Sequence, residues 1–211
     1  MMLSWLQTYL QQLNGVDIDL RVEHFLVDEK TRGVIPGSQE ELQEQIFVRQ
    51  EGEETELALY IAPEIIERLG SDRPFERLHG GNLKETCIAV EGVSHFVMLV
   101  WRGCVGRPVR ALELEIQAEV DKFLCAWFWL TDQGHCLEKS AEKIFELFFE
   151  NFALHDAVPT TERERYWIAH RTAKRFCRKL LTSPKSHNRT WVNSQARRFF
   201  RLGLSEKLRA A

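Results

Sequence analysis

The first half of the chain combines helix-like and strand-like patterns of apolar side chains. Residues 3–13 place four leucines at helical spacing and predict a helix. Residues 16–23 (VDIDLRVE) alternate strictly between apolar and polar side chains, which is typical of a half-buried strand. Residues 44–50 and 56–62 flank the polar turn EGEET and predict an antiparallel hairpin. Residues 94–101 (SHFVMLVW) are apolar on both faces and predict a buried inner strand.

Helical patterns dominate the rest of the chain. A short helix is predicted at residues 63–69, where Pro63 takes a favoured first-turn position, and another begins near Asn82. Longer helices are predicted at about residues 108–131, 137–153, 161–182 and 192–208. A β-rich first half followed by an all-helical second half favours an α+β fold, in which a small antiparallel sheet packs against helices.

Charge is distributed unevenly along the 211 residues, although the formal net charge is only −3. Residues 1–156 carry 14 Lys and Arg against 28 Asp and Glu, whereas residues 157–211 carry 14 against 3. We therefore predict an acidic α+β core over 1–156 and a basic helical segment over 157–211 that packs on this core. Such a segment indicates an anionic partner, which is an acidic protein surface, nucleic acid or the acidic core of the same chain.

Basic and aromatic side chains share the outward faces of the C-terminal helices. This combination suits phosphate groups and stacked bases, and it suits an acidic protein surface equally well. The candidate binding residues are Arg163, Trp167, Arg171, Lys174, Arg175, Arg178, Arg197, Arg198 and Arg201. We predict that they contact the anionic partner.

The stretch RALELEIQAEVDK, residues 110–122, holds four carboxylates within thirteen residues. As a strand, it would place Glu115 and Gln117 on one face, in the Glu-x-Gln arrangement of some metal-dependent nucleases. However, Ala, Leu, Glu, Gln and Lys favour a helix, and the apolar pattern continues without a break into residues 123–130. We therefore predict a helix, whose geometry distributes the carboxylates around the axis and places Asp121 on the wetter side.

Glu113 lies at the border of the apolar stripe of this helix, with Gln117 one turn further on. A carboxylate at such a position needs a partner, because an unpaired buried carboxylate is costly and takes up a proton. The preceding apolar segment offers His95 and Arg102 as partners. Two interpretations remain open: Glu113, Gln117 and His95 form a catalytic pocket, or Glu113 and Gln117 form a buried structural hydrogen-bond pair.

The sequence lacks the common motifs for cofactors and metals, so neither is predicted. Walker A, dinucleotide-binding glycine and GxSxG motifs do not occur, and the seven histidines show no tight metal-ligand spacing. The five cysteines are odd in number and include no CxxC pair, which argues against a disulfide framework and a zinc ribbon. The longest apolar run, FLCAWFWL, has eight residues and is too short to cross a bilayer. The N-terminus lacks the features of a signal peptide, so we predict a cytoplasmic protein.

These observations favour a cytoplasmic binding or adaptor protein that contacts an anionic partner through its basic C-terminal helices. The alternative is an enzyme, a metal-dependent hydrolase or nuclease, with Glu113, Glu115, Gln117 and His95 near its site. A pocket that brings carboxylates and histidine together would favour the enzyme. A continuous exposed surface of basic and aromatic side chains would favour binding.

Overall fold

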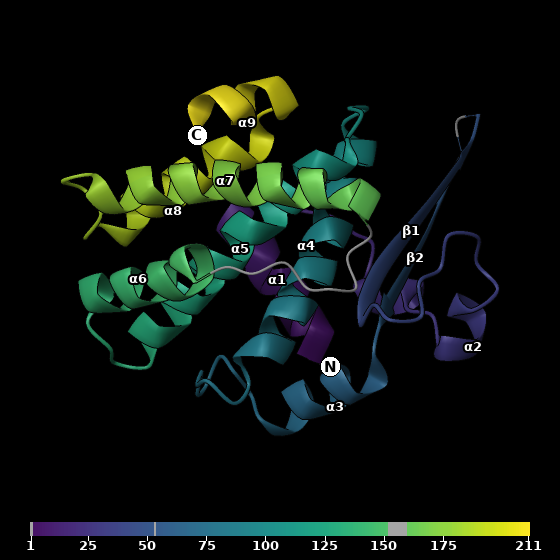
Figure 1. The fold of residues 1–211 in the computed structure, drawn as a ribbon, viewed down its shortest axis with the longest axis horizontal. Coiled ribbons are helices and arrows are strands. Elements are labelled where there is room, and N and C mark those ends of the chain that lie inside the picture. The colour runs from purple at the N-terminus through teal and green to yellow at the C-terminus, as the bar shows by residue number, and fades with distance from the viewer. Residues whose placement is uncertain (1, 53, 152–159) are drawn as a thin grey trace.

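A computed structural model describes residues 2–52, 54–151 and 160–211. In chain order its elements are α1 (Met2–Asn14), the 3-10 turn η1 (Val22–Phe25), α2 (Glu29–Arg32), β1 (Glu44–Glu51), β2 (Glu54–Ile61), α3 (Pro63–Ser71), α4 (Leu83–Cys104), α5 (Ala111–Asp132), α6 (Leu137–Phe145), the π-helical turn η2 (Glu146–Glu150), α7 (Thr160–Thr182), α8 (Arg189–Arg201) and α9 (Leu204–Ala210). Within the described residues the sheet is the antiparallel pair β1–β2, and every element from α3 onward is helical (Figure 1). The α+β prediction is confirmed. The predicted boundary at residue 156 lies outside the described residues.

The helices α4 and α5 form the centre of the fold. The short connection between them lets α5 fold back along α4, and α5 also contacts α6 and α7. Figure 1 shows the β-hairpin at one end of the molecule and α6 towards the other, with α7 passing over α5. Large side chains on different sides of α5 are buried, among them Phe123, Trp127 and Trp129. Residues 123–130 make the second half of α5 apolar around its whole circumference, which is typical of a helix in the interior of a protein.

The strand predicted at residues 94–101 is wrong, because these residues form the second half of α4. A continuous apolar run predicts burial on all sides, but it does not distinguish an inner strand from an inner helix. Phe96, Val97 and Met98 are all fully buried. Three consecutive side chains on a helix point in widely different directions, so α4 is enclosed at this level. The predicted helix start near Asn82 is confirmed.

Among the described residues, α4 alone is long and apolar enough to span a membrane, judged by length and composition. However, 61% of its most apolar window is buried inside the fold. Its neighbours are α1, α3, α5 and both strands of the hairpin. α4 therefore has the character of the core helix of a soluble protein, while the cytoplasmic localisation stays a prediction.

The strand predicted at residues 16–23 is also wrong. Residues 16–21 form no regular secondary structure, and the chain then enters η1. A side chain of α1 takes the place of a neighbouring strand. The Gln7 amide donates to the Leu20 carbonyl oxygen at 2.8 Å, and Gln7 Oε1 accepts from the Val22 N–H at 2.8 Å. The alternating pattern predicted that Leu20 faces the core, but its side chain is 48% exposed.

Two predicted helix boundaries differ from the structure. The helix expected to reach residue 153 ends at Phe145 and continues as η2, in which Phe149 is fully buried. The single helix predicted at 192–208 is divided into α8 and α9 next to Gly203. The Gly203 N–H donates to the Glu206 carboxylate at 2.9 Å and so caps the first turn of α9.

The predicted hairpin is confirmed, with Ile46 opposite Leu59 in the antiparallel register. The hairpin packs directly on α4. A Cβ atom on Gly92 of α4 would lie 2.9 Å from Glu44 Cγ of β1, which is closer than packed carbon atoms approach. Gly92 therefore permits the Glu44 side chain to reach the surface of α4, where it takes part in the polar cluster described below.

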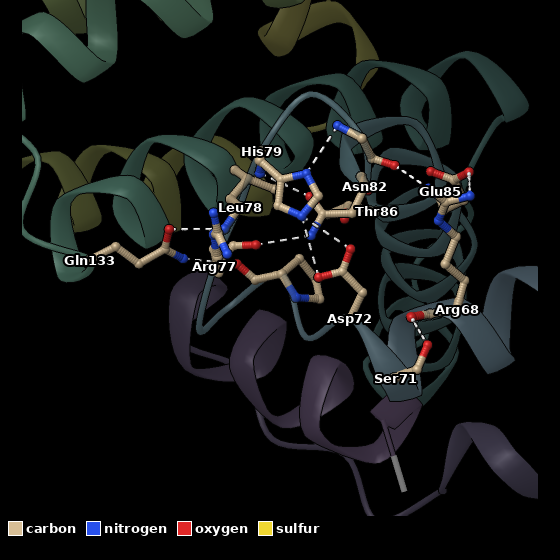
Figure 2. A network of polar contacts seen from close by, with 12 residues as sticks. Arg68, Ser71, Asp72, Arg77, Leu78, His79, Asn82, Glu85, Thr86 and Gln133 are labelled. Atoms are coloured by element: carbon tan, nitrogen blue, oxygen red, sulfur yellow. Dashed lines mark hydrogen bonds and ion pairs between the residues drawn. The ribbon is translucent and has the colours of Figure 1, made fainter.

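A network of polar contacts holds the connection between α3 and α4 (Figure 2). The buried side chain of Asn82 accepts from the His79 N–H at 2.9 Å and donates to the Arg77 carbonyl oxygen at 2.9 Å. Gln133, just beyond the C-terminal end of α5, accepts from the Leu78 N–H at 2.9 Å. These contacts attach the connection to the end of the central helix, so we assign them to the fold.

The C-terminal end of α1 is stabilised from within and from α8. Gly15 adopts a left-handed backbone (φ 63°). Its N–H donates to the Gln12 carbonyl, and the Val16 N–H donates to the Gln11 carbonyl, which together form a Schellman motif. Arg197 of α8 also donates to the Gln12 carbonyl, at 2.8 Å. A Cβ atom on Gly15 would lie 2.8 Å from Arg197 Cδ.

We predict that Gly15→Ala lowers the free energy of unfolding by about 1–2 kcal/mol, because the left-handed backbone disfavours a side chain and Arg197 must move. Gly70→Ala is the matched control, since Gly70 lies in α3 with open space around it. This control should raise the free energy of unfolding by about 0.5 kcal/mol through helix propensity. Urea unfolding of both variants checks the prediction, which fails if the two changes have the same sign.

Candidate functional site

Glu113, the first candidate catalytic residue, lies in a buried ion pair. It is 4% exposed, and its Oε1 lies 3.3 Å from Nη2 of Arg102. Its Oε2 accepts from the Arg110 N–H at 3.1 Å. The Arg102 guanidinium also donates to the Leu202 carbonyl oxygen at 2.6 Å. Both charges therefore have further hydrogen bonds, which a buried ion pair requires for stability.

Gln117 belongs to a second buried group, the Asp121–Lys207 network, which consists of Asn14, Ser94, Gln117, Asp121 and Lys207. The Asp121 carboxylate accepts from the Gln117 amide at 2.9 Å and from Ser94 Oγ at 2.6 Å. It also accepts from the Asn14 amide at 3.2 Å. Gln117 Oε1 in turn accepts from Lys207 Nζ at 2.7 Å. The network joins α1, α4, α5 and α9, and Asp121 is fully buried rather than on the wetter side.

Burial changes the protonation equilibria of this network. It lowers the pKa of Lys207 to about 7, although the Asp121 charge opposes this shift. It raises the pKa of Asp121, while hydrogen bonds from Ser94, Gln117 and Asn14 act in the other direction. Lys207 also donates to the Phe199 carbonyl oxygen at 2.9 Å. Each polar group of the network has a complementary partner, which is typical of a structural hydrogen-bond network. Gln117 bonds to Asn14, Asp121 and Lys207 rather than to Glu113, so the described residues do not form the predicted Glu113–Gln117 pair.

His95 lies in a different group, the His95 cluster, which consists of Glu44, Glu91, His95, Glu115 and Arg165. The Nε2 atom of His95 lies 3.7 Å from Glu115 Oε2, and its Nδ1 lies 3.5 Å from Glu44 Oε1. The Arg165 guanidinium lies 3.4 Å from Glu115 Oε1. The cluster therefore brings together side chains from α4, α5, α7 and β1.

The depth of the His95 cluster varies across its members. His95 is 5% exposed and Glu115 is 7% exposed, whereas the Glu91 side chain is 23% exposed and lies at the rim. At this rim Lys122 pairs with Glu91 at 2.9 Å and with Glu119 at 2.6 Å. The cluster is thus a buried centre with one carboxylate towards solvent.

Two groups of the His95 cluster have a pKa that differs strongly from the usual value. Burial disfavours the protonated form of His95, but the carboxylates of Glu44, Glu115 and Glu91 outweigh it and raise the pKa to about 9. Burial raises the pKa of Glu115 to about 7, against the opposing charges of His95 and Arg165. Such perturbed groups in one place are suited to proton transfer or to binding a cation.

The sequence pointed to His95 and Glu115 but not to Glu44 and Glu91. The interpretation of residues 94–101 as a strand left Glu91 outside the segment. On a helix, Glu91 and His95 lie one turn apart on the same face, and this spacing was the available signal. Glu44 reaches the cluster from the hairpin, and no local pattern places it there.

Four of the candidate binding residues contact groups of this chain. Lys174 and Arg178 both pair with the Glu150 carboxylate. Arg197 and Arg201 donate to carbonyl oxygens at the C-terminal end of α1. Positive charge is favourable at that end of a helix, so these side chains stabilise the docking of α7 and α8 on the acidic part of the chain.

Most of the other candidate binding residues lie at the surface, although Arg163 is half-buried. Arg163, Trp167, Arg171 and Arg175 follow each other at four-residue spacing along α7, in the order of a surface stripe. Trp167 is 46% exposed. Arg171, Arg175 and Arg198 are exposed and form no ion pair within the described parts of the chain.

A groove of about 580 Å³ lies between α7, α8 and α9. Apolar side chains line its floor: Phe176, Leu180, Trp191, Phe199 and Leu202. Three basic residues, Lys179, Arg198 and Arg209, also line it. Lys179 continues the four-residue spacing of the α7 stripe, so the stripe leads into the groove.

Comparisons with protein-family models, with curated proteins and with solved structures find no match to this chain. The three buried polar groups and the groove are therefore the basis for a functional proposal.

We predict that Lys207 makes the stability of the fold depend on pH. Its folded-state pKa of about 7 lies below the usual value of 10.5, so between these values the unfolded chain binds the additional proton. Stability consequently rises with pH in this window. Relative to Lys207→Met, the free energy of unfolding of the natural protein should rise by about 1.4 kcal/mol per pH unit between about pH 7 and 10.

Urea unfolding at a series of pH values measures this difference. The exposed Lys139 on α6 provides the control, because Lys139→Met should leave the pH dependence unchanged. Equal pH slopes for the natural protein and for Lys207→Met would show that the Lys207 ammonium keeps its ordinary pKa in the fold.

Proposed function

We propose that the protein is a non-catalytic binding module, whose groove between α7, α8 and α9 holds an acidic and partly apolar segment of another protein. The observation that supports this most directly is one groove with both an apolar floor and basic edges. Burial of the half-exposed side chains of Trp191 and Leu202 provides affinity, and the basic residues select a partner of negative charge.

The charge of the groove comes from Arg198, Arg209 and Lys179. Arg198 and Arg209 are exposed, and neither pairs with a carboxylate of the described chain. The acidic residue in the lining, Glu206, is already held by the Gly203 N–H at 2.9 Å. The groove therefore presents an excess of positive charge to a partner, and the α7 stripe extends this charge beyond it.

An acidic protein segment fits these observations better than nucleic acid does. Affinity for nucleic acid rises with the number of cations available to phosphates, and four of the candidate cations are engaged within the chain. The rings of Phe176 and Phe199 stack on each other with centroids 3.9 Å apart and are only 8% and 1% exposed, so they offer little surface to bases. An apolar side chain of a protein partner requires no exposed ring face.

The alternative function, a metal-dependent hydrolase or nuclease, stays a hypothesis. Its predicted centre at Glu113 and Gln117 is less suitable, because both side chains have partners that serve the fold. The histidine and carboxylates that such an enzyme needs are those of the His95 cluster, in which Glu115 of α5 lies 3.7 Å from His95 Nε2, whereas Glu113 pairs with Arg102.

Selection of a displayed random-peptide library against the folded protein tests the proposed function. We expect the selected peptides to be rich in Asp and Glu combined with Leu and Phe. Arg198→Glu/Arg209→Glu should weaken their binding by at least about tenfold, because two attractive contacts become repulsive. Fluorescence anisotropy of labelled peptides, with a labelled oligonucleotide measured beside them, provides the affinities.

Lys139→Glu/Lys143→Glu is the matched control, since it makes the same change of charge on exposed positions of α6 away from the groove. This control should bind the selected peptides like the natural protein. Selection of peptides without acidic residues, equal loss in both double variants, or tighter binding of the oligonucleotide would contradict the proposal.

A further inference from the structure

Three side chains that are able to bind a metal converge in the His95 cluster. One ligand atom from each of Glu91, His95 and Glu115 lies within 4.8 Å of the others. Glu91 and His95 are one turn apart on α4, and Glu115 faces them from α5. Both helices belong to the packed centre of the fold, so the positions of the three side chains are well defined.

The imidazole of His95 is the observation that points to a ligand. It is 5% exposed, yet neither ring nitrogen makes a hydrogen bond with any described residue. The nearest carboxylate oxygens, on Glu44 and Glu115, lie at 3.5 and 3.7 Å, which is beyond normal hydrogen-bond length. Buried polar groups without a partner are rare in proteins, and a metal-bound nitrogen is one way of satisfying an imidazole.

Each carboxylate of the trio has an oxygen that is not used by a neighbouring cation. Glu91 contacts Lys122 through Oε2, which leaves Oε1. Glu115 faces Arg165 with Oε1, which leaves Oε2 on the side of His95. Each of the two cations therefore contacts one oxygen of its carboxylate and leaves the other oxygen for a ligand contact.

The balance of charge around the His95 cluster also favours the binding of a divalent cation. Four carboxylates, those of Glu44, Glu91, Glu115 and Glu119, are buried or half-buried at this place. The permanent cations among them are Lys122 and Arg165. These four carboxylates outnumber the two permanent cations, and the energetic cost of burying unpaired carboxylates favours an additional positive charge at this place.

We propose that Glu91, His95 and Glu115 bind one divalent transition-metal ion. One imidazole nitrogen and two carboxylate oxygens suit Zn²⁺ or Mn²⁺, whereas Mg²⁺ and Ca²⁺ prefer oxygen ligands alone. Glu44 Oε1 lies 3.5 Å from the opposite ring nitrogen of His95, on the side where a carboxylate commonly accompanies a metal-binding histidine. The ion joins α4 to α5, and the inference does not depend on the groove between α7, α8 and α9.

Titration of the metal-free protein with Co²⁺ tests this site, because Co²⁺ replaces Zn²⁺ and absorbs visible light. We expect one equivalent to bind with a visible absorption band. Glu91→Gln should weaken binding by at least about tenfold. This substitution lies at the rim and preserves the size of the side chain, so thermal unfolding should verify that the fold remains intact.

Glu85→Gln is the matched control, because Glu85 lies on the same helix with a similar side-chain exposure and a salt bridge to Arg68. It should bind Co²⁺ like the natural protein. The natural protein loaded with Zn²⁺ provides a measurement without any substitution. Its X-ray absorption spectrum should show nitrogen and oxygen ligands at about 2.0–2.2 Å.

Three results would overturn the proposal. The natural protein binds no Co²⁺, or Glu91→Gln and Glu85→Gln bind it as tightly as the natural protein, or the Zn²⁺ spectrum shows sulfur at about 2.3 Å. The last result would place the ion on exposed thiols, such as those of Cys104 and Cys136, instead of the His95 cluster.

Discussion

The carboxylates of α5 are buried away from water, and the rest of the structure depends on this constraint. This helix carries Glu113, Glu115 and Asp121 into the interior, and each needs compensation for its lost hydration. Arg102 from α4 contacts Glu113, Arg165 from α7 contacts Glu115, and Lys207 from α9 reaches Asp121 through Gln117. The central helix thus determines where its neighbours place their cations, so charge pairing and apolar packing specify the same arrangement of helices.

The division of charge along the sequence has a physical explanation in these contacts. Much of the positive charge of the last helices neutralises groups of the first part of the chain, as in the pairing of Lys174 and Arg178 with Glu150. Arg189 pairs with Asp132 at the end of α5 in the same way. The number of basic residues in the segment is therefore larger than the number available to a partner. What remains outward, on the α7 stripe and at the edges of the groove, is the part relevant to binding.

Sequence patterns predicted those elements that have one apolar and one polar side. The hairpin, α1 and α3 are of this kind, and the α+β class followed from them. The patterns failed for α4, because a helix enclosed on all sides loses its periodicity and resembles a buried strand. They failed for Asp121 for the same reason, since the wetter side of α5 faces α1 and α4 rather than solvent. At residues 16–23, the hydrogen bonds that a strand would need come from the Gln7 side chain, which no local pattern indicates.

The candidate site could be predicted only in part, because its members come from distant segments. The sequence indicates His95 and Glu115 as polar residues in apolar surroundings. Their contact, however, depends on how α4 packs against α5. Glu44 depends in addition on Gly92, which lets the hairpin approach α4. A reader of the sequence alone has no means of joining these positions, since each is separated from the others by complete secondary-structure elements.

The Asp121–Lys207 network and the His95 cluster are both acidic, but they differ in how completely their polar atoms are hydrogen-bonded. In the Asp121–Lys207 network every buried side-chain nitrogen and oxygen of the five residues has a hydrogen-bond partner within the described chain. In the His95 cluster Glu44 Oε1, both nitrogens of His95 and Nε of Arg165 have none. The Asp121–Lys207 network is the more deeply buried of the two, so burial alone does not account for the unsatisfied atoms of the His95 cluster. A protein core tolerates few unsatisfied polar atoms, and their concentration around one imidazole is the feature that distinguishes a place for a ligand from a structural network.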